Sequence, residues 1–170
     1  APKIEKIDFD LDRYGYALCV VDTGGNHADL TGEYAAIPAE MKRVAKALGG
    51  EVLREVSEEE FYKKIPELRK EVGDRAILRA IHFFDDNRVV DKEVAALKAG
   101  DFETFKQCVI ASGHSSAMNL QNVFAVVNPQ EQGLSLALAL IAKILGGKGA
   151  YRVHGGGFAG TVQAYVPLDM

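Results

Sequence analysis

Residues 151–165 of the chain read YRVHGGGFAGTVQAY, with glycine at four of the six positions from 155 to 160. Glycine lacks Cβ, so it can adopt a positive φ and lets backbone amides approach a ligand closely. The residues from 161 to 166 alternate and are β-branched or aromatic, which predicts a strand. Dinucleotide-binding loops and Walker loops continue instead into a helix whose N-terminus faces the phosphate. The stretch is therefore a strand–glycine loop–strand element, and the simplest alternative is a tight hairpin whose glycines serve only the turn.

Upstream of this element the chain predicts strands first and helices afterwards. Residues 7–11 alternate apolar and acidic side chains, which is typical of a half-buried strand. Residues 16–21 form a short apolar run, which we expect in the middle of a sheet. Apolar residues then recur at helical spacing in several segments. The signals that bound these segments are Pro38 in an opening turn, Gly49-Gly50 and Gly100 as stops, Ser57 and Asp101 as N-caps, Pro66 as a break, and 112–116 as an interruption.

The last helical segment and the two strands after it complete the pattern. Residues 134–145 are apolar nearly all round the helix, so we expect this helix to be buried. Strands are predicted at about 150–154 and 161–166, on either side of the glycines. The order of strands, helices and strands predicts an α+β fold, with a mainly antiparallel sheet and helices packed on one side. No linker or internal repeat divides residues 1–170, which we interpret as a single domain.

Composition excludes several classes of partner. The chain has 170 residues and a net charge of −4, without the clustered excess of Lys and Arg that a nucleic-acid partner requires. No uncharged apolar run reaches the roughly 18 residues of a membrane span, and the start has no signal-peptide pattern. The chain opens with Ala-Pro-Lys rather than Met, and we interpret it as a piece of a longer polypeptide.

The ligating residues do not predict a metal. Cys19 and Cys108 lie in apolar segments, and we expect both to be buried and reduced, as in a cytoplasmic protein. No second ligand lies at zinc-like spacing from either cysteine. Asp85 and Asp86 are neighbours on a predicted helix and point in different directions, so they are expected to form a solvated charge pair.

The glycine-rich stretch also resembles a known motif. Residues 152–162, RVHGGGFAGTV, are similar to the third, glycine-rich motif of galactokinases, in the GHMP small-molecule kinase superfamily. Further fragments resemble the family in family order and near family spacing. They are residues 21–34, 45–56, 80–88 and 97–102. The resemblance covers nearly the whole chain and implies the C-terminal (ferredoxin-like) domain of a GHMP kinase.

The chain departs from the family pattern at four places, which bear on sugar specificity rather than on the fold. The family's arginine pair after the tyrosine is replaced by residues 35–38, AAIP. Its Glu-Ser-His reads Ala-Ser-Gly at 111–113, with His114 one place off. Its Cys-Pro-Glu-Leu-Asp is matched only loosely by NPQEQ at 128–132, and Ala159 replaces a glycine.

The resemblance implies roles for a few residues. Tyr34 matches the family tyrosine whose hydroxyl contacts galactose, and a phenol can both donate to and accept from a sugar hydroxyl. The loop residues match the motif that lies beside the phosphate loop of the other domain, where they support that loop and the nucleotide pocket: Gly155, Gly156, Gly157, Phe158 and Gly160. The resemblance assigns no catalytic residue and no metal ligand to this chain.

Four histidines have plainer explanations. A hydrogen bond at a turn is the favoured role for His27, and side-chain packing for His82. His114 and His154 adjoin glycines, where turn formation is an adequate explanation.

The resemblance implies an activity for the whole protein. A galactokinase transfers the γ-phosphoryl of ATP, with Mg²⁺, to the anomeric hydroxyl of galactose. The N-terminal half of the family pattern, with its sugar signature, phosphate loop and catalytic aspartate, is not in this chain, so we expect the piece alone to be inactive and to bind no cofactor. Three alternatives remain: a non-catalytic regulator that binds galactose and ATP, a kinase for a related sugar such as N-acetylgalactosamine or arabinose, and a module used only for subunit or domain contact.

Overall fold

The computed structural model describes residues 4–25 and 29–170. Its strands are β1 (Tyr16–Asp22), β2 (Ala150–Val153) and β3 (Thr161–Pro167). Its helices are α1 (Thr31–Ala47), α2 (Glu58–Lys63), α3 (Ile65–Val72), α4 (Asp74–Ala99), α5 (Phe102–Ser115) and α6 (Gly133–Leu145). Short 3₁₀ turns lie at Leu11–Tyr14 and Leu53–Glu55, and a π-helical turn at Ser116–Leu120 follows α5 directly.

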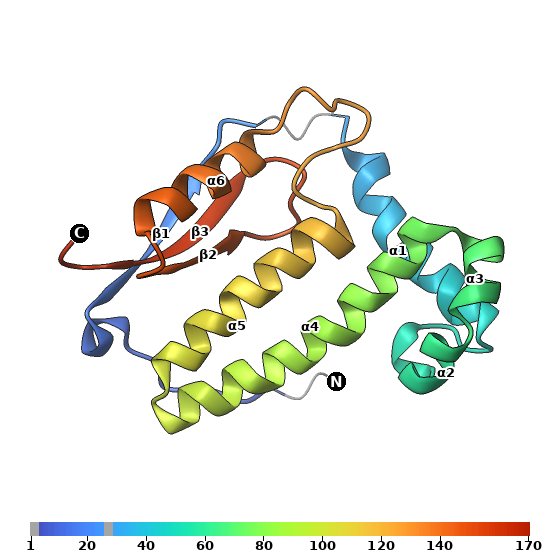
Figure 1. Ribbon diagram of the computed structural model, residues 1–170, viewed down its shortest axis with the longest axis horizontal. Coiled ribbons are helices and arrows are strands. Elements are labelled where there is room, and N and C mark those ends of the chain that lie inside the picture. The colour runs from blue at the N-terminus through green and yellow to red at the C-terminus, as the bar shows by residue number, and fades with distance from the viewer. Residues whose placement is uncertain (1–3, 26–28) are drawn as a thin grey trace.

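The strands form an antiparallel sheet in the order β1-β3-β2, and the helices pack on one side of it (Figure 1). The predicted α+β class is therefore confirmed. β3 is the central strand, because Val162 pairs with Val21 of β1 and with Val153 of β2. The glycine loop joins β2 to β3, so the strand–loop–strand prediction is also confirmed.

Two predictions about the first residues of the chain are wrong. Residues 7–11 form no strand: the Asp10 carboxylate accepts a hydrogen bond from the amide of Asp12 and caps a 3₁₀ turn, which Gly15 ends in the left-handed conformation. β1 lies at an edge of the sheet rather than in its middle, because β3 is its only strand neighbour among the described residues. Cys19 is consequently exposed, whereas Cys108 is buried as expected.

Local capping chemistry places most of the helix boundaries. Ser57 accepts a hydrogen bond from the amide of Glu60 and caps α2, and Asp101 accepts one from the amide of Thr104 and caps α5. Pro66 opens the separate helix α3, and Gly100 ends α4 in the left-handed conformation. These predictions are confirmed.

Two helix predictions need correction. α1 begins at Thr31, because the amides of Glu33 and Tyr34 already bond to the carbonyl of Leu30, and Pro38 therefore lies inside the helix rather than in its opening turn. α5 is not interrupted at 112–116; it runs to Ser115 and continues as the π-helical turn.

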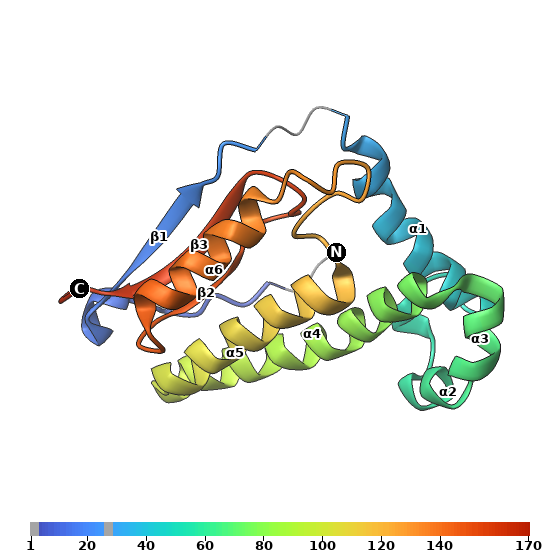
Figure 2. The same ribbon diagram turned by 45° about the horizontal axis from the view of Figure 1, so that its top comes forward.

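The helices form two groups around their cores. α5 lies beside the C-terminal part of α4, while α2 and α3 lie at the end of the molecule remote from the sheet (Figures 1 and 2). The core between α1 and α4 includes Val44, Phe61 and Ala80, and these side chains are fully buried. α6 packs Leu134 against Val153 and Val162 of the sheet. We expect such dense apolar contact to supply most of the stability of the fold.

The prediction that α6 is buried all round is wrong. Leu136, Leu140 and Ile144 are 63%, 51% and 68% exposed, at helical spacing along one stripe. The stripe is an apolar surface that the described part of this chain leaves uncovered. Across the described residues, no helix has the length and apolar character needed to span a membrane.

Candidate functional site

The glycine loop between β2 and β3 adopts a conformation that requires glycine. Gly155, Gly157 and Gly160 have φ values of 71°, 79° and 92°. Phe158 also has a positive φ, of 60°, although it carries a side chain. A positive φ in a residue with a Cβ is unfavourable and persists only where the surroundings hold it. The contacts of this loop therefore determine its shape.

Asn122 holds the loop from the side of α5. The carbonyl oxygen of Asn122 accepts a hydrogen bond from the amide of Phe158 over 2.5 Å, and the Nδ2 of Asn122 donates to the carbonyl of Gly156 over 3.2 Å. A Cβ on Gly157 would lie 2.1 Å from the carbonyl oxygen of Asn122, so no larger residue fits there without displacement. Asn122 itself is 2% exposed.

Tyr34, in the first turns of α1, holds the next peptide of the loop. Its hydroxyl donates to the carbonyl of Gly157 over 2.7 Å, and its ring packs edge-on against Phe158 with 5.2 Å between centroids. A Cβ on Gly156 would lie 2.8 Å from the Tyr34 ring. Burial raises the pKa of the Tyr34 hydroxyl, which keeps it protonated and able to donate. The structure thus brings together the two parts of the predicted site.

The segment after β1 holds the far end of the loop. The amide and the hydroxyl of Thr23 both donate to the carbonyl of Gly160, over 2.9 and 2.6 Å. Gly25 lies against Ala159, where an added Cβ would approach the Ala159 methyl to 3.1 Å. The loop is therefore held at three points by segments far apart in the sequence.

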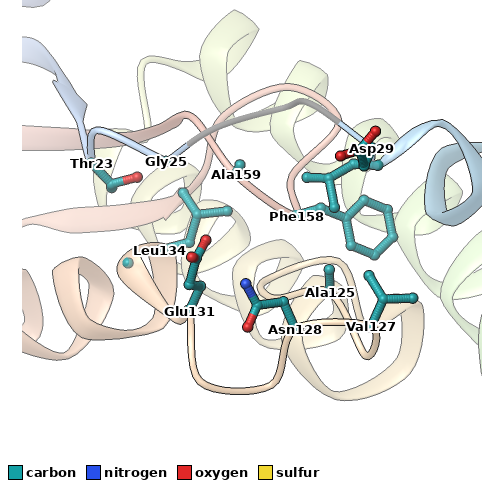
Figure 3. Close-up of a pocket in the computed structure, with 12 residues that line it drawn as sticks. Thr23, Gly25, Asp29, Ala125, Val127, Asn128, Glu131, Leu134, Phe158 and Ala159 are labelled. Atoms are coloured by element: carbon teal, nitrogen blue, oxygen red, sulfur yellow. The ribbon is translucent and has the colours of Figure 1, made fainter.

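A cavity of about 410 Å³ lies beside this loop (Figure 3). Phe158 and Ala159 line it on the loop side, and Asn128 and Glu131 line it from the segment before α6, with Asp29 opposite them. Its described lining carries two carboxylates and no Lys or Arg. Carboxylates and amides are suited to the hydroxyl groups of a neutral polar ligand, and they repel phosphate.

The sequence of this chain is similar to those of galactokinases over most of its length. It is 33% identical over 154 residues to the galactokinase of Actinobacillus pleuropneumoniae serotype 5b, an alignment that covers 91% of this chain and 38% of that protein. The galactokinase of Haemophilus influenzae strain PittEE is 32% identical over 153 residues, with 90% and 38% covered. The chain is related to the C-terminal part of galactokinases. No protein-family model matches it.

A solved galactokinase structure has the same fold as this chain. The crystal structure of Lactococcus lactis galactokinase complexed with galactose matches it with a TM-score of 0.69 and 25% identity, over 91% of this chain and 38% of that chain. The chain therefore spans about two fifths of the length of the galactokinases it matches. The remaining parts of those proteins have no counterpart among its 170 residues.

Sequence reasoning missed two residues of the site in this galactokinase relative. Asn122 and Thr23 both bind the glycine loop, yet Thr23 lies where the sequence predicts only a turn, and no sequence pattern singles out Asn122. No spacing rule connects either residue to positions 155–160. The glycine run was the only sequence signal. A loop with several positive φ values needs contacts that hold its shape, but the run does not identify the residues that make them.

His82 and His154 each have a hydroxyl partner within the described residues. His82 is buried, and its Nδ1 lies 2.9 Å from the hydroxyl of Ser115, which fits the packing role expected of it. The ring of His154 lies 3.0 Å from the hydroxyl of Thr161, across the base of the loop. His27 lies outside the described residues.

The adjacent aspartates do not form a metal centre. Asp85 pairs with Arg88, while Asp86 accepts a 2.5 Å hydrogen bond from Ser112, which in turn accepts one from Arg152. Among residues 4–25 and 29–170, no three His, Cys, Asp or Glu side chains are grouped so as to hold a metal ion.

Proposed function

We propose that this chain is the C-terminal domain of a galactokinase, which transfers the γ-phosphoryl of ATP to the anomeric hydroxyl of galactose. The observation that carries the proposal is the three-point attachment of the glycine loop, with Tyr34 bonded to Gly157, in a chain that matches galactokinases over 91% of its length. Phosphoryl transfer depends mainly on positioning and electrostatic stabilisation. A domain that supplies oriented backbone groups and one sugar contact is consistent with that chemistry.

The proposed partner of this domain is the N-terminal domain of the same protein. Relatives extend well beyond the 38% of their length that the chain matches. The exposed stripe of Leu136, Leu140 and Ile144 on α6 supports a covering partner, because contiguous exposed apolar surface usually marks an interface. We propose that the phosphate loop and the catalytic carboxylate come from that domain, and that this chain alone is inactive.

Within the site, we propose that Tyr34 contacts the sugar as well as the loop. A phenol can both donate and accept hydrogen bonds, which suits a sugar hydroxyl. The cavity beside Phe158 supports a hydroxyl-rich ligand nearby, because its described lining carries Asp29, Asn128 and Glu131 among apolar residues. Gly155, Gly156, Gly157, Phe158 and Gly160 would then shape the nucleotide side of the same site.

We propose that the whole protein uses Mg²⁺ together with ATP. The proposal names no Mg²⁺ ligand in this chain. A cytoplasmic location, expected from the two reduced thiols, stays a prediction.

The test is an assay of the full-length protein for ATP-dependent phosphorylation of sugars. We expect the protein to phosphorylate galactose more efficiently than either N-acetylgalactosamine or arabinose. Preference for one of those would keep the kinase and change the substrate. Tight binding of galactose and ATP without product would favour the regulator instead. Failure to bind or phosphorylate any aldohexose would remove the proposal.

A further inference from the structure

The amide of Gly157 belongs to a buried residue, and the described protein supplies no acceptor for it. Gly155 and Gly156 are exposed. Throughout residues 4–25 and 29–170, none of these three amides donates a hydrogen bond, although the amides of His154, Phe158 and Ala159 on either side all do. Buried backbone donors are nearly always paired in folded proteins. The Gly157 amide is therefore directed toward something that these residues do not include.

Two side chains determine the direction of that amide. The carbonyl of Gly156 accepts from Nδ2 of Asn122 over 3.2 Å. Because a trans peptide is planar, with its C=O and N–H antiparallel, the N–H of Gly157 points away from Asn122. The next peptide is held as well, since the Gly157 carbonyl accepts from Tyr34 over 2.7 Å and the Phe158 amide donates to Asn122. Rotation of either peptide would break these bonds.

The neighbouring residues extend this arrangement into a set of donors. Gly155 and Gly157 have φ values of 71° and 79°, while Gly156 between them is not in the positive region. Turns built on such positive-φ residues can direct successive N–H groups toward one side, which makes a concavity that favours anions. A single carbonyl oxygen could accept from one of these three amides. A phosphate group has several oxygen acceptors and can accept from more than one of them.

We propose that Asn122 is a positioning residue whose side chain keeps the Gly157 amide directed away from Asn122, where it binds an anionic oxygen of the nucleotide phosphates. This inference rests on the proposed kinase function and adds a direct phosphate contact to the supporting role expected of the loop. Asn122 does not touch the ligand itself; it acts through the peptide between Gly156 and Gly157.

The test uses Asn122→Asp in the full-length protein, which preserves shape and replaces the donor by a carboxylate. We expect the dissociation constant for a magnesium complex of a non-hydrolysable ATP analogue to rise about 10- to 100-fold at about pH 8, from loss of one oriented hydrogen bond to a charged group. A protonated carboxyl can donate again. The difference from wild type should therefore narrow at about pH 5.5, since burial raises carboxyl pKa values.

The matched control is Asn119→Asp, the same chemical change close by, at a residue that bonds only to Ser115 within the described chain. It should bind the analogue as wild type does at both pH values. Thermal unfolding of each variant checks that it folds. Should Asn122→Asp fail to fold, glycine amides of the wild type labelled with ¹⁵N provide the second measurement, and the Gly157 signal should shift when the analogue is added.

The outcomes separate the two proposals. A folded Asn122→Asp variant that binds the analogue as tightly as wild type at both pH values overturns the positioning role, as does a Gly157 signal that nucleotide does not move. A wild type that binds no nucleotide also overturns it. A wild type that binds nucleotide but phosphorylates no sugar contradicts the proposed function only. The nucleotide affinities of the variants then still test the positioning role of Asn122.

Discussion

Arg79 and Glu40 form an ion pair in the interior of the molecule, with 2.8 Å between Nη1 and Oε2. Arg79 is 1% exposed and Glu40 is 7% exposed. The Nε of Arg79 also donates to the carbonyl of Leu120 over 3.1 Å, two positions before Asn122. The pair therefore connects α1 and α4 to the turn from which Asn122 reaches the glycine loop.

Arg79→Ala should be strongly destabilising. Removing one member of a buried pair leaves the other charge without compensation, which costs about 3–5 kcal/mol of the free energy of unfolding. Arg75 also bonds to Glu40, over 2.6 Å, and moderates the loss. Urea denaturation of the purified chain measures the effect. Arg69→Ala, which breaks the exposed pair with Asp74, is the control and should leave the midpoint nearly unchanged. Equal midpoints for the two variants would contradict a structural role for the buried pair.

Gly157→Ala should destabilise the chain more than Gly155→Ala. Both positions have positive φ, so an alanine at either one costs about 1–2 kcal/mol from backbone strain. Only at Gly157 would the new Cβ also meet the Asn122 carbonyl, 2.1 Å away, whereas Gly155 has open space around it. Comparing denaturation midpoints isolates the steric effect. If both alanines cost the same, Asn122 does not confine the loop.

Tyr34→Phe should cost about 0.5–1.5 kcal/mol of stability, because it removes the hydrogen bond to Gly157 and keeps the ring contact with Phe158. Tyr14→Phe is a suitable control, since Tyr14 stacks on Phe102 and its hydroxyl makes no hydrogen bond within the described residues. In the full-length protein the proposed sugar contact adds a second effect, a raised KM for galactose. If Tyr34→Phe lowers stability but leaves the KM for galactose unchanged, Tyr34 holds the loop and does not contact the sugar.

Stability should fall as the pH is lowered through about 6.5, because of His82. Burial lowers the pKa of His82, and the nearby carboxylate of Asp86 only partly opposes this. The unfolded chain therefore binds the proton more tightly, and the free energy of unfolding decreases as the pH drops below the unfolded pKa. His82→Gln should flatten this part of the profile.

Glu93 contributes in a different pH window and with the opposite sign. Burial raises the pKa of the Glu93 carboxyl above the ordinary 4.5, so the folded chain binds this proton more tightly than the unfolded chain does. The resulting contribution to the free energy of unfolding is lost as the pH rises above about 4.5. Comparison of the His82→Gln profile with wild type at each pH separates the two groups. Identical slopes in both proteins near neutrality would exclude His82 as the cause.

The elements that the sequence predicted correctly are those whose signals are local. β2, the glycine loop and β3 follow one another in a single stretch, and Ser57 and Asp101 cap their helices through bonds to amides three residues away. Such signals operate in any context, because the donor and the acceptor are already neighbours in the chain. The resemblance to galactokinases was carried by the same stretch and by fragments in order along the chain.

The wrong predictions share a different origin. Residues 7–11 have the alternation of a strand but no strand beside them, and Phe9 packs instead against Phe105. The apolar run of β1 lies at a sheet edge, and α6 leaves Leu136 and Ile144 exposed. Apolar pattern reports which side chains favour burial; it does not specify what covers them, or whether the covering surface belongs to these 170 residues.

The sequence by itself determined the glycine loop, its two strands and the family they resemble, because glycine's freedom at positive φ and the alternation of strand residues are properties of adjacent positions. Only the tertiary structure decided which groups hold the loop. Tyr34 and Asn122 reach Gly157 and Gly156 from 123 and 34 positions away. Contacts over such separations depend on how α1, α5 and the sheet pack, and close packing admits one arrangement that no local pattern encodes.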